Sequence, residues 1–256
     1  MADRQRYRAI VAYVGTDFHG WQIQRNAPRT VQAVLEQALS EFSGEHVRAL
    51  AAGRTDTGVH ADGQVVHFDL SGAPDAREVR DAVNTLLPWD VRLLGVWPAP
   101  ELFHARRDAI GKDYLYRWSR AEVIAPRDSP FVAPLSRAAE AARMAEAARH
   151  LPGRRDFAVF AVRGRRDDSV RTLLSVTIGE QGEELTATVR GDAFLRGMVR
   201  SICGLLADIG RGRFPPERVR EILETGDRRL LAQKAPAKGL TLVRVEYGKD
   251  AAGEGR

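Results

Sequence analysis

The chain has 256 residues, enough for one large domain or two smaller ones, and a hydrophobic fraction of 44% provides for a core. A net charge of +5 and a pI of about 9.7 favour an acidic partner such as nucleic acid. Nearly all of the cations are arginines, which suit phosphate and bases but are also typical of a GC-rich genome. The single cysteine, Cys203, excludes an internal disulfide and a cysteine-based metal cluster.

The sequence carries no sign of a targeting or membrane segment. The N-terminal residues MADRQRYRAI lack the apolar core of a secretion signal, and no apolar stretch is long enough to span a membrane. These features predict a cytoplasmic protein. Cys203 falls in an apolar stretch, where we expect it to be a small core residue.

The first half of the chain predicts the order strand, helix, strand, strand, helix, strand. Alternating apolar residues predict strands over 6–14, 47–52, 64–70 and 91–97. Apolar residues three and four apart predict helices over 30–42 and 75–87. Thr30 is the expected N-cap of the first helix, and Pro88 ends the second. This order is typical of a split βαβ unit, which is an antiparallel sheet with helices on one face.

The second half repeats this arrangement loosely. We expect strands over 112–120, 156–160, 170–178, 184–190 and 240–247. We expect helices over 136–150, 194–209 and 216–224. The whole chain therefore predicts an α+β fold of two similar halves with antiparallel sheets and helices packed on one face. The halves are residues 1–108, which carry the Asp56 loop described next, and residues 109–248, followed by a frayed tail over 249–256.

One loop between two predicted strands carries the strongest functional pattern. The segment GRTDTGVHA, residues 53–61, places a single carboxylate, Asp56, at its tip. Asp, Thr and Gly are common turn formers, so their presence is also compatible with an ordinary turn. Arg54 and His60 are not needed for a turn, and they favour a functional loop held by a scaffold. A lone buried carboxylate needs a cation to stay ionised, and Arg54 and Arg200 are the candidates.

Several enzyme classes lack their patterns in this sequence. Asp56 has no partner carboxylate in its loop, which argues against a paired-carboxylate hydrolase. The sequence has no HExxH or Cys/His set for zinc, no P-loop or GxGxxG for a nucleotide, and no GxSxG of a serine hydrolase. We therefore expect neither a metal nor a nucleotide cofactor.

Seven segments, in order, resemble the tRNA pseudouridine synthase A family. The loop GRTDTGVHA is similar to the family signature GRTDAGVHA, with Thr57 in place of alanine. The other segments are GTDFHGWQ (15–22), TVQAVLEQAL (30–39), FHAR (103–106), KDYLY (112–116), FLRGMVR (194–200) and APAKGLTLVRVEY (235–247). The resemblance covers nearly the whole chain. A second departure is Val159 in DFAVF, where the family more often has serine.

The resemblance implies an isomerase that turns uridine into pseudouridine at positions 38, 39 and 40 of the tRNA anticodon arm. It implies a homodimer that needs no cofactor. Asp56 matches the catalytic aspartate of the family, and Arg200 matches the basic residue that pairs with it. Tyr114 matches a tyrosine that contacts the target base, Arg54 a residue that helps to extrude the uridine, and Leu240 an apolar residue of the pocket.

Several alternatives stay open at this point. Ionised Asp56 has three possible roles: attack on C1′, attack on C6 of the ring, or removal of a ribose proton. A non-catalytic tRNA-binding or tRNA-folding protein on the same scaffold is the rival function, and a metal-dependent nuclease is disfavoured by the missing acidic cluster. The charged segment RGRRDD (163–168), Arg211 and Arg213 are either phosphate-binding groups or ordinary solvated charges.

Overall fold

A computed structural model describes residues 4–162 and 168–248, and its described residues form two compact units. Unit 1 comprises the residues up to Ile110 and from Leu242 onward, and unit 2 is Gly111–Thr241. The chain passes from unit 1 into unit 2 within strand β5 (Ala109–Ser119) and returns within strand β10 (Leu240–Tyr247). The expected tail over 249–256 and most of the RGRRDD segment lie outside the described residues.

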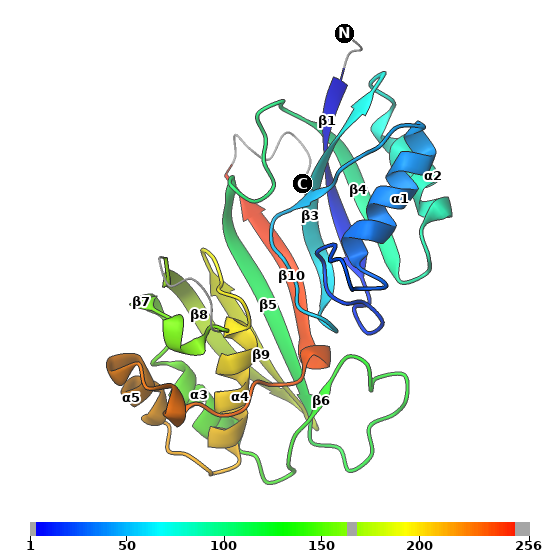
Figure 1. The fold of residues 1–256 in the computed structure, drawn as a ribbon. Coiled ribbons are helices and arrows are strands. Elements are labelled where there is room, and N and C mark those ends of the chain that lie inside the picture. The colour runs from blue at the N-terminus through cyan, green and yellow to red at the C-terminus, as the bar shows by residue number, and fades with distance from the viewer. Residues whose placement is uncertain (1–3, 163–167, 249–256) are drawn as a thin grey trace. The chain divides into compact units, whose positions relative to one another are not determined.

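Unit 1 is built on a sheet with the strand order β4-β1-β3-β10, with β2 beside β3 (Figure 1). Its other strands are β1 (Arg4–Tyr13), β2 (Leu50–Ala51), β3 (His60–Ser71) and β4 (Val91–Ala99). Strand β1 runs antiparallel to both β3 and β4. In the β1–β3 register Tyr7 lies opposite Phe68, and their buried rings stack with centroids 5.8 Å apart. The predicted order of the first six elements is confirmed.

The two helices described in unit 1 each begin directly after a capping side chain, which was predicted for Thr30. Helix α1 (Val31–Ser43) starts after Thr30, whose hydroxyl accepts a backbone N–H of the first turn. Helix α2 (Ala76–Leu86) starts after Asp75, whose carboxylate accepts two such N–H groups. The helices lie side by side, and α2 packs against β4 (Figure 1). Each helix thus buries its apolar stripe toward the sheet side of unit 1.

Unit 2 has the strand order β5-β9-β8-β7, and each of these neighbours pairs antiparallel. Its other strands are β6 (Ala133–Pro134), β7 (Gly153–Asp156), β8 (Val170–Gln181) and β9 (Glu184–Gly191). Its helices are α3 (Ala141–Ala148), α4 (Met198–Gly210) and α5 (Arg218–Thr225), and its 3-10 helices are η1 (Ala158–Phe160), η2 (Arg228–Leu230) and η3 (Ala237–Gly239). Helix α3 packs on α4 and β8. The predicted α+β class with antiparallel strands is confirmed.

Strand β5 and helix α4 both contribute buried side chains to the core of unit 2. Tyr114, Tyr116 and Trp118 alternate along β5, and all three are buried on one face, as the sequence predicts. Cys203 on α4 is fully buried, as expected, and burial raises the pKa of its thiol. None of the described helices in either unit is long and apolar enough to cross a membrane.

Four predicted elements have different bounds in the structure. The strand expected over 47–52 is limited to β2, the segment 156–160 is mostly 3-10 helix, and the helix expected over 136–150 is limited to α3. Helix α4 begins at Met198 rather than at residue 194, because Gly197 has a φ of 74°, which a right-handed helix does not allow. Arg196, which falls within the helix expected over 194–209, therefore lies before α4 and does not share a helical face with Arg200.

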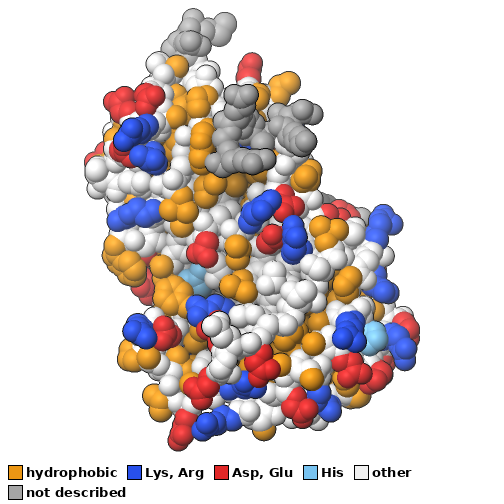
Figure 2. All heavy atoms as spheres, turned by 180° about the vertical axis from the view of Figure 1, so that it is seen from behind, with side chains coloured by type: hydrophobic (Ala, Val, Ile, Leu, Met, Phe, Trp, Pro, Cys, Tyr) orange, Lys and Arg blue, Asp and Glu red, His pale blue; other side chains and the backbone are white. Residues whose placement is uncertain are grey.

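Basic side chains do not gather into a single patch on the surface drawn in Figure 2. Lys and Arg side chains are interspersed there with acidic and hydrophobic ones. Many arginines of the described chain are paired with carboxylates, and Arg211 and Arg213 both contact Asp208, at 2.9 and 3.1 Å. This pairing favours solvated ion pairs over phosphate binding at those two arginines.

Candidate active site

The Asp56 loop, residues 53–59, connects β2 to β3 within unit 1. The Asp56 carbonyl accepts the N–H of Val59 at 3.1 Å, and Gly58 between them has a φ of 77°. These features close a tight turn that requires a glycine. The Asp56 side chain is half-buried, whereas Thr57 and Arg54 are exposed. The hydroxyl that Thr57 brings in place of alanine therefore lies on the exposed side of the turn.

The segment 15–22 braces this loop through its backbone. The N–H of Trp21 donates to the Thr55 carbonyl at 3.2 Å, and the N–H of Gly58 donates to the Phe18 carbonyl at 3.3 Å. The two hydrogen bonds flank Asp56 on either side. They fix the backbone on both sides of Asp56 through main-chain groups that do not depend on side-chain rotamers.

Two glycines allow the close approach between the segment and the loop. A Cβ placed on Gly20 would lie 2.6 Å from the Thr55 carbonyl oxygen, and Gly20 also has a φ of 82°. A Cβ on Gly15 would overlap the Val59 carbonyl. The N–H of Gly15 donates to Nδ1 of His60 at 3.0 Å, so this buried histidine has a bracing role. His60 was singled out from the sequence without this role, and Gly15 and Gly20 were given no role of their own, although the two glycines of GTDFHG were the visible signal.

Buried side chains hold the base of the loop. The Tyr13 hydroxyl and Thr55 Oγ1 share a hydrogen bond of 2.8 Å, and Gln64 Nε2 donates to the Gly53 carbonyl at 2.9 Å. Burial raises the pKa of Tyr13 to about 12, so the hydroxyl keeps its proton at neutral pH. Neither Tyr13 nor Gln64 could be assigned this role from the sequence, because nothing in the local pattern links either residue to the loop.

Tyr114, Arg200 and Leu240 belong to unit 2, whereas Asp56 and Arg54 belong to unit 1. Tyr114 is 8% exposed. Its ring meets the ring of Phe194 edge-on, with centroids 5.0 Å apart. Leu240 is buried at the point where η3 passes into β10. Tyr114 and Phe194 thus link strand β5 to the segment that precedes α4.

A reciprocal pair of hydrogen bonds positions Arg200 in the first turn of α4. Its Nε donates to the Ala235 carbonyl at 2.9 Å, and the N–H of Ala235 donates to the Arg200 carbonyl at 2.9 Å. The same segment is tied to β5, since the Tyr116 hydroxyl donates to the Pro236 carbonyl at 2.8 Å. Unit 2 therefore brings Arg200 and the chain leading into Leu240 together beside β5.

Comparison with known proteins gives this geometry its context. The model of the tRNA pseudouridine synthase family matches residues 9–108 and 147–248. The protein of Listeria welshimeri named tRNA pseudouridine synthase A is 43% identical over 94% of this chain and 99% of its own length. The chain belongs to the tRNA pseudouridine synthase family. The family predicted from the sequence is thereby confirmed.

Proteins from two other bacteria match similar shares of this chain. A Chlamydia trachomatis protein named tRNA pseudouridine synthase A is 41% identical over 93% of this chain and 90% of its own length. A Nitratidesulfovibrio vulgaris protein of the same name is 40% identical over 94% of this chain and 96% of its own length. The similarity between this chain and its relatives therefore extends through both units.

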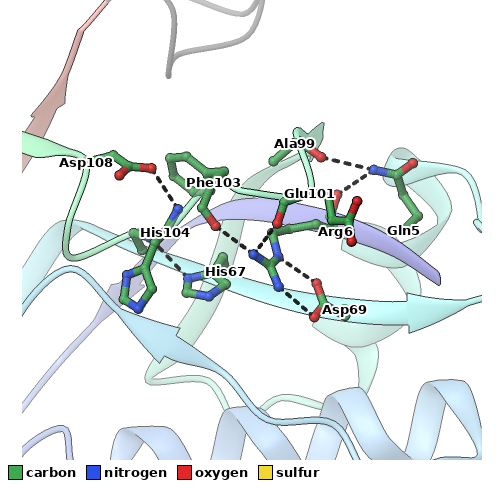
Figure 3. A network of polar contacts seen from close by, with 10 residues as sticks. Gln5, Arg6, His67, Asp69, Ala99, Glu101, Phe103, His104 and Asp108 are labelled. Carbon is green, nitrogen blue, oxygen red and sulfur yellow. Dashed lines mark hydrogen bonds and ion pairs between the residues drawn. The ribbon is translucent and has the colours of Figure 1, made fainter.

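The FHAR segment of this synthase family member is anchored by a polar network in unit 1 (Figure 3). Arg6 binds both oxygens of Asp69, at 2.7 and 2.9 Å, and donates to the Phe103 carbonyl at 3.0 Å. The N–H of Ala105 donates to Nδ1 of buried His67 at 3.1 Å. Burial, with a further contribution from nearby cations, lowers the pKa of His67 to about 4. The neutral His67 therefore holds the FHAR segment by accepting this hydrogen bond, and the role of His67 is structural.

The described residues contain no group of three or more His, Cys, Asp and Glu side chains placed to hold a metal ion. Val159, the departure from the serine more usual in the family, is buried in η1. Its side chain is therefore a core residue of unit 2.

Proposed function

We propose that this protein isomerises uridine to pseudouridine at positions 38, 39 and 40 of the tRNA anticodon arm. The observation that carries the proposal is the family match through both units together with an intact GRTDTGVHA loop. The reaction breaks the N1–C1′ bond, turns the base and forms a C5–C1′ bond. C5 loses its proton and N1 gains one, so the reaction needs no redox partner or group donor.

Asp56 is the proposed catalytic carboxylate, and Arg200 is the cation that pairs with it and keeps it ionised. The bracing of the Asp56 loop supports this role, because a reacting group has to be held to within a fraction of an ångström. The reciprocal bonds between Arg200 and Ala235 give the guanidinium a similarly defined place. The roles of attack on C1′, attack on C6 and removal of a ribose proton stay open for Asp56.

Three further residues have proposed roles in binding the target nucleotide. The uridine has to leave its stack, which costs a few kcal/mol. Arg54 is the residue proposed to help this extrusion, and its exposure beside the Asp56 turn supports the role. Tyr114 contacts the extruded base, and Leu240 lines the pocket. The edge-on support of Tyr114 by Phe194 favours a fixed ring over a mobile one.

The proposed partners are the anticodon arm of tRNA and a second copy of the chain, in the cytoplasm. The positive net charge and the name of the relatives support the tRNA partner. A homodimer would widen the surface that a tRNA can contact. Because charges of both signs are mixed on the face in Figure 2, we expect the tRNA backbone to be held at separate cationic points.

Tritium release from tRNA carrying [5-³H]uridine tests the proposal, because forming the C5–C1′ bond removes the hydrogen from C5 without any added group donor. We expect release by the wild type and none by Asp56→Ala, with tRNA binding retained. Asp62→Asn is the matched control, because Asp62 is an exposed carboxylate at the start of β3, and we expect it to act as the wild type does. A folded wild type that binds tRNA without any release would support the non-catalytic alternative.

A further inference from the structure

A cavity in unit 2 lies beside the first turns of α4, and we call it the α4 pocket. Its volume is about 420 Å³, and its polar lining consists of Ser201 on α4, Arg228 on η2 and Lys234. The remaining lining is apolar, and none of the described lining residues is acidic. A cavity with two cations and a hydroxyl, and with no acidic group among them, fits an anion.

Hydrogen bonds fix the walls of the α4 pocket. Nη1 of Arg228 donates to the carbonyls of Ala158 and Ala161, at 3.1 and 2.6 Å. The N–H of Val162 donates to the Arg196 carbonyl at 2.9 Å, just before α4 begins. The guanidinium is thus held in place by the chain itself, and the pocket does not need a ligand to form.

Lys234 adds its charge at an end of α4 that is already positive. A Cβ placed on Gly197, the N-cap of α4, would lie 3.6 Å from Cδ and 3.9 Å from Nζ of Lys234. The first turn of α4 contains no acidic residue, and its N-cap provides no side-chain hydrogen bond. A helix N-terminus carries about half a positive charge, so an ammonium group there is unfavourable unless an anion binds beside it.

Ser201 adds a hydroxyl group to the α4 side of the pocket. The residue is 5% exposed and lines the pocket. A serine hydroxyl can donate a hydrogen bond, so it suits an anion held in the pocket.

We propose that the α4 pocket binds a phosphate group of the tRNA backbone, an inference that rests on the proposed function. The pocket is adjacent to Arg200 along two segments, since Ser201 follows Arg200 and Lys234 precedes Ala235, the hydrogen-bond partner of Arg200. A phosphate held there belongs to a nucleotide near the target uridine. Contacts to phosphate position a nucleic acid strand and carry no sequence information. The pocket therefore aligns the strand for the reaction.

Removing the Lys234 charge is the first test. We expect Lys234→Gln to raise the dissociation constant and KM for tRNA about 10-fold, the effect of one lost hydrogen bond to a charged group, with kcat unchanged. The slope of log affinity against log salt should fall by about 0.7 to 0.9. Lys234→Arg should restore binding. Arg220→Gln, which removes the same charge from an exposed position of α5, should leave affinity and slope unchanged.

A second pair of variants places a charge in the pocket without touching its donors. Ala232 lines the pocket and is partly exposed, so Ala232→Glu should fold and repel a phosphate. We expect it to weaken tRNA binding about 10-fold or more, whereas the uncharged Ala232→Gln should have a much smaller effect. Equal effects of the two variants would mean steric blocking, and would overturn the electrostatic proposal.

The outcomes separate the pocket from the proposed function. Binding of tRNA is measured directly, so a wild type that makes no pseudouridine but loses affinity in Lys234→Gln would contradict only the proposed function. An active wild type whose tRNA affinity is unchanged in both Lys234→Gln and Ala232→Glu would overturn only the pocket. If inorganic phosphate raises the melting temperature of the wild type and not of Lys234→Gln, while tRNA affinity is the same, the pocket binds a free anion and the proposal is wrong.

Discussion

The Asp56 loop in unit 1 and the Arg200 end of α4 in unit 2 are held in different ways. Main-chain hydrogen bonds and glycine contacts fix the loop on both sides of Asp56. The other region also has a main-chain hydrogen bond, from the N–H of Ala235 to the Arg200 carbonyl, but side-chain donors add to it, since Arg200 and Tyr116 each donate to a carbonyl of the segment 235–236. The difference indicates that the loop depends more on backbone contacts, whereas the Arg200 region depends more on bonds made by its long side chains.

The largest effect is expected from filling the contact between Gly20 and the loop. Gly20→Ala would press a methyl group against the Thr55 carbonyl at a positive φ, so we expect a loss of about 3 to 5 kcal/mol in the free energy of unfolding. Gly44→Ala is the control, because Gly44 also has a positive φ, of 70°, but would have no atom within 4 Å of its Cβ. It should cost about 1 to 2 kcal/mol.

Urea unfolding of both variants measures this difference, and tritium release from labelled tRNA reports the effect on the reaction. Equal destabilisation by the two substitutions would show that the main-chain contact is not what holds the loop. If Gly20→Ala loses much of its stability but its folded fraction keeps normal activity, the contact at Gly20 stabilises the fold and is not needed to position Asp56.

Acid should weaken unit 1 through His67, the next effect in size. The pKa of His67 is about 4 in the folded protein against an ordinary value of 6.5, so the unfolded chain takes up the proton first as the pH falls. The stabilisation is fully present above about pH 6.5, and it is lost progressively down to about pH 4. The loss is at most about 3 kcal/mol.

Urea unfolding at several pH values between 7 and 4 checks this expectation. His67→Gln should be less stable at pH 7 and should lose most of the pH dependence in this window. His19→Gln is the control, because His19 is exposed, and it should keep the pH dependence of the wild type. A pH dependence in His67→Gln equal to that of the wild type would assign the acid sensitivity to other groups.

Local patterns predicted much of unit 1. The cap at Thr30 and the order of its elements follow from short-range rules, and the structure confirms them. The break before α4 was missed, because the apolar spacing continues through Gly197 and only its backbone conformation ends the helix.

The supports of the candidate site could not be predicted from local patterns. The bracing of the Asp56 loop joins residues such as Gly20 and Thr55 that are far apart in the sequence. The spacing of apolar residues predicts local structure and carries no information about such long-range contacts. The α4 pocket likewise combines η2, the segment after η1 and α4. Asp56, Arg200, Tyr114, Arg54 and Leu240 stay predictions until their variants are measured.

Arg200→Lys should reduce the rate of the reaction more than stability. Lysine keeps the charge but has no Nε–H to donate to the Ala235 carbonyl, so the cation loses its fixed orientation. We expect kcat for pseudouridine formation to fall about 10- to 30-fold, and the free energy of unfolding to fall by about 1 kcal/mol. Arg196→Lys is the control, because Arg196 is exposed and lies before α4. A similar fall in kcat for both variants would mean that general charge, not the orientation of Arg200, is what matters.

The smallest effects compare one hydroxyl in each region. Tyr13→Phe removes the bond to Thr55, and Tyr116→Phe removes the bond to the Pro236 carbonyl. Each should cost about 1 kcal/mol in the free energy of unfolding. Main-chain contacts still hold the loop in Tyr13→Phe, so kcat/KM should change less than about twofold. Fewer contacts remain in Tyr116→Phe, so kcat/KM should fall about fivefold. Equal falls in kcat/KM would mean that the loop depends on its side chains as much as the Arg200 region does, because the main-chain bonds alone would then not keep Asp56 in place.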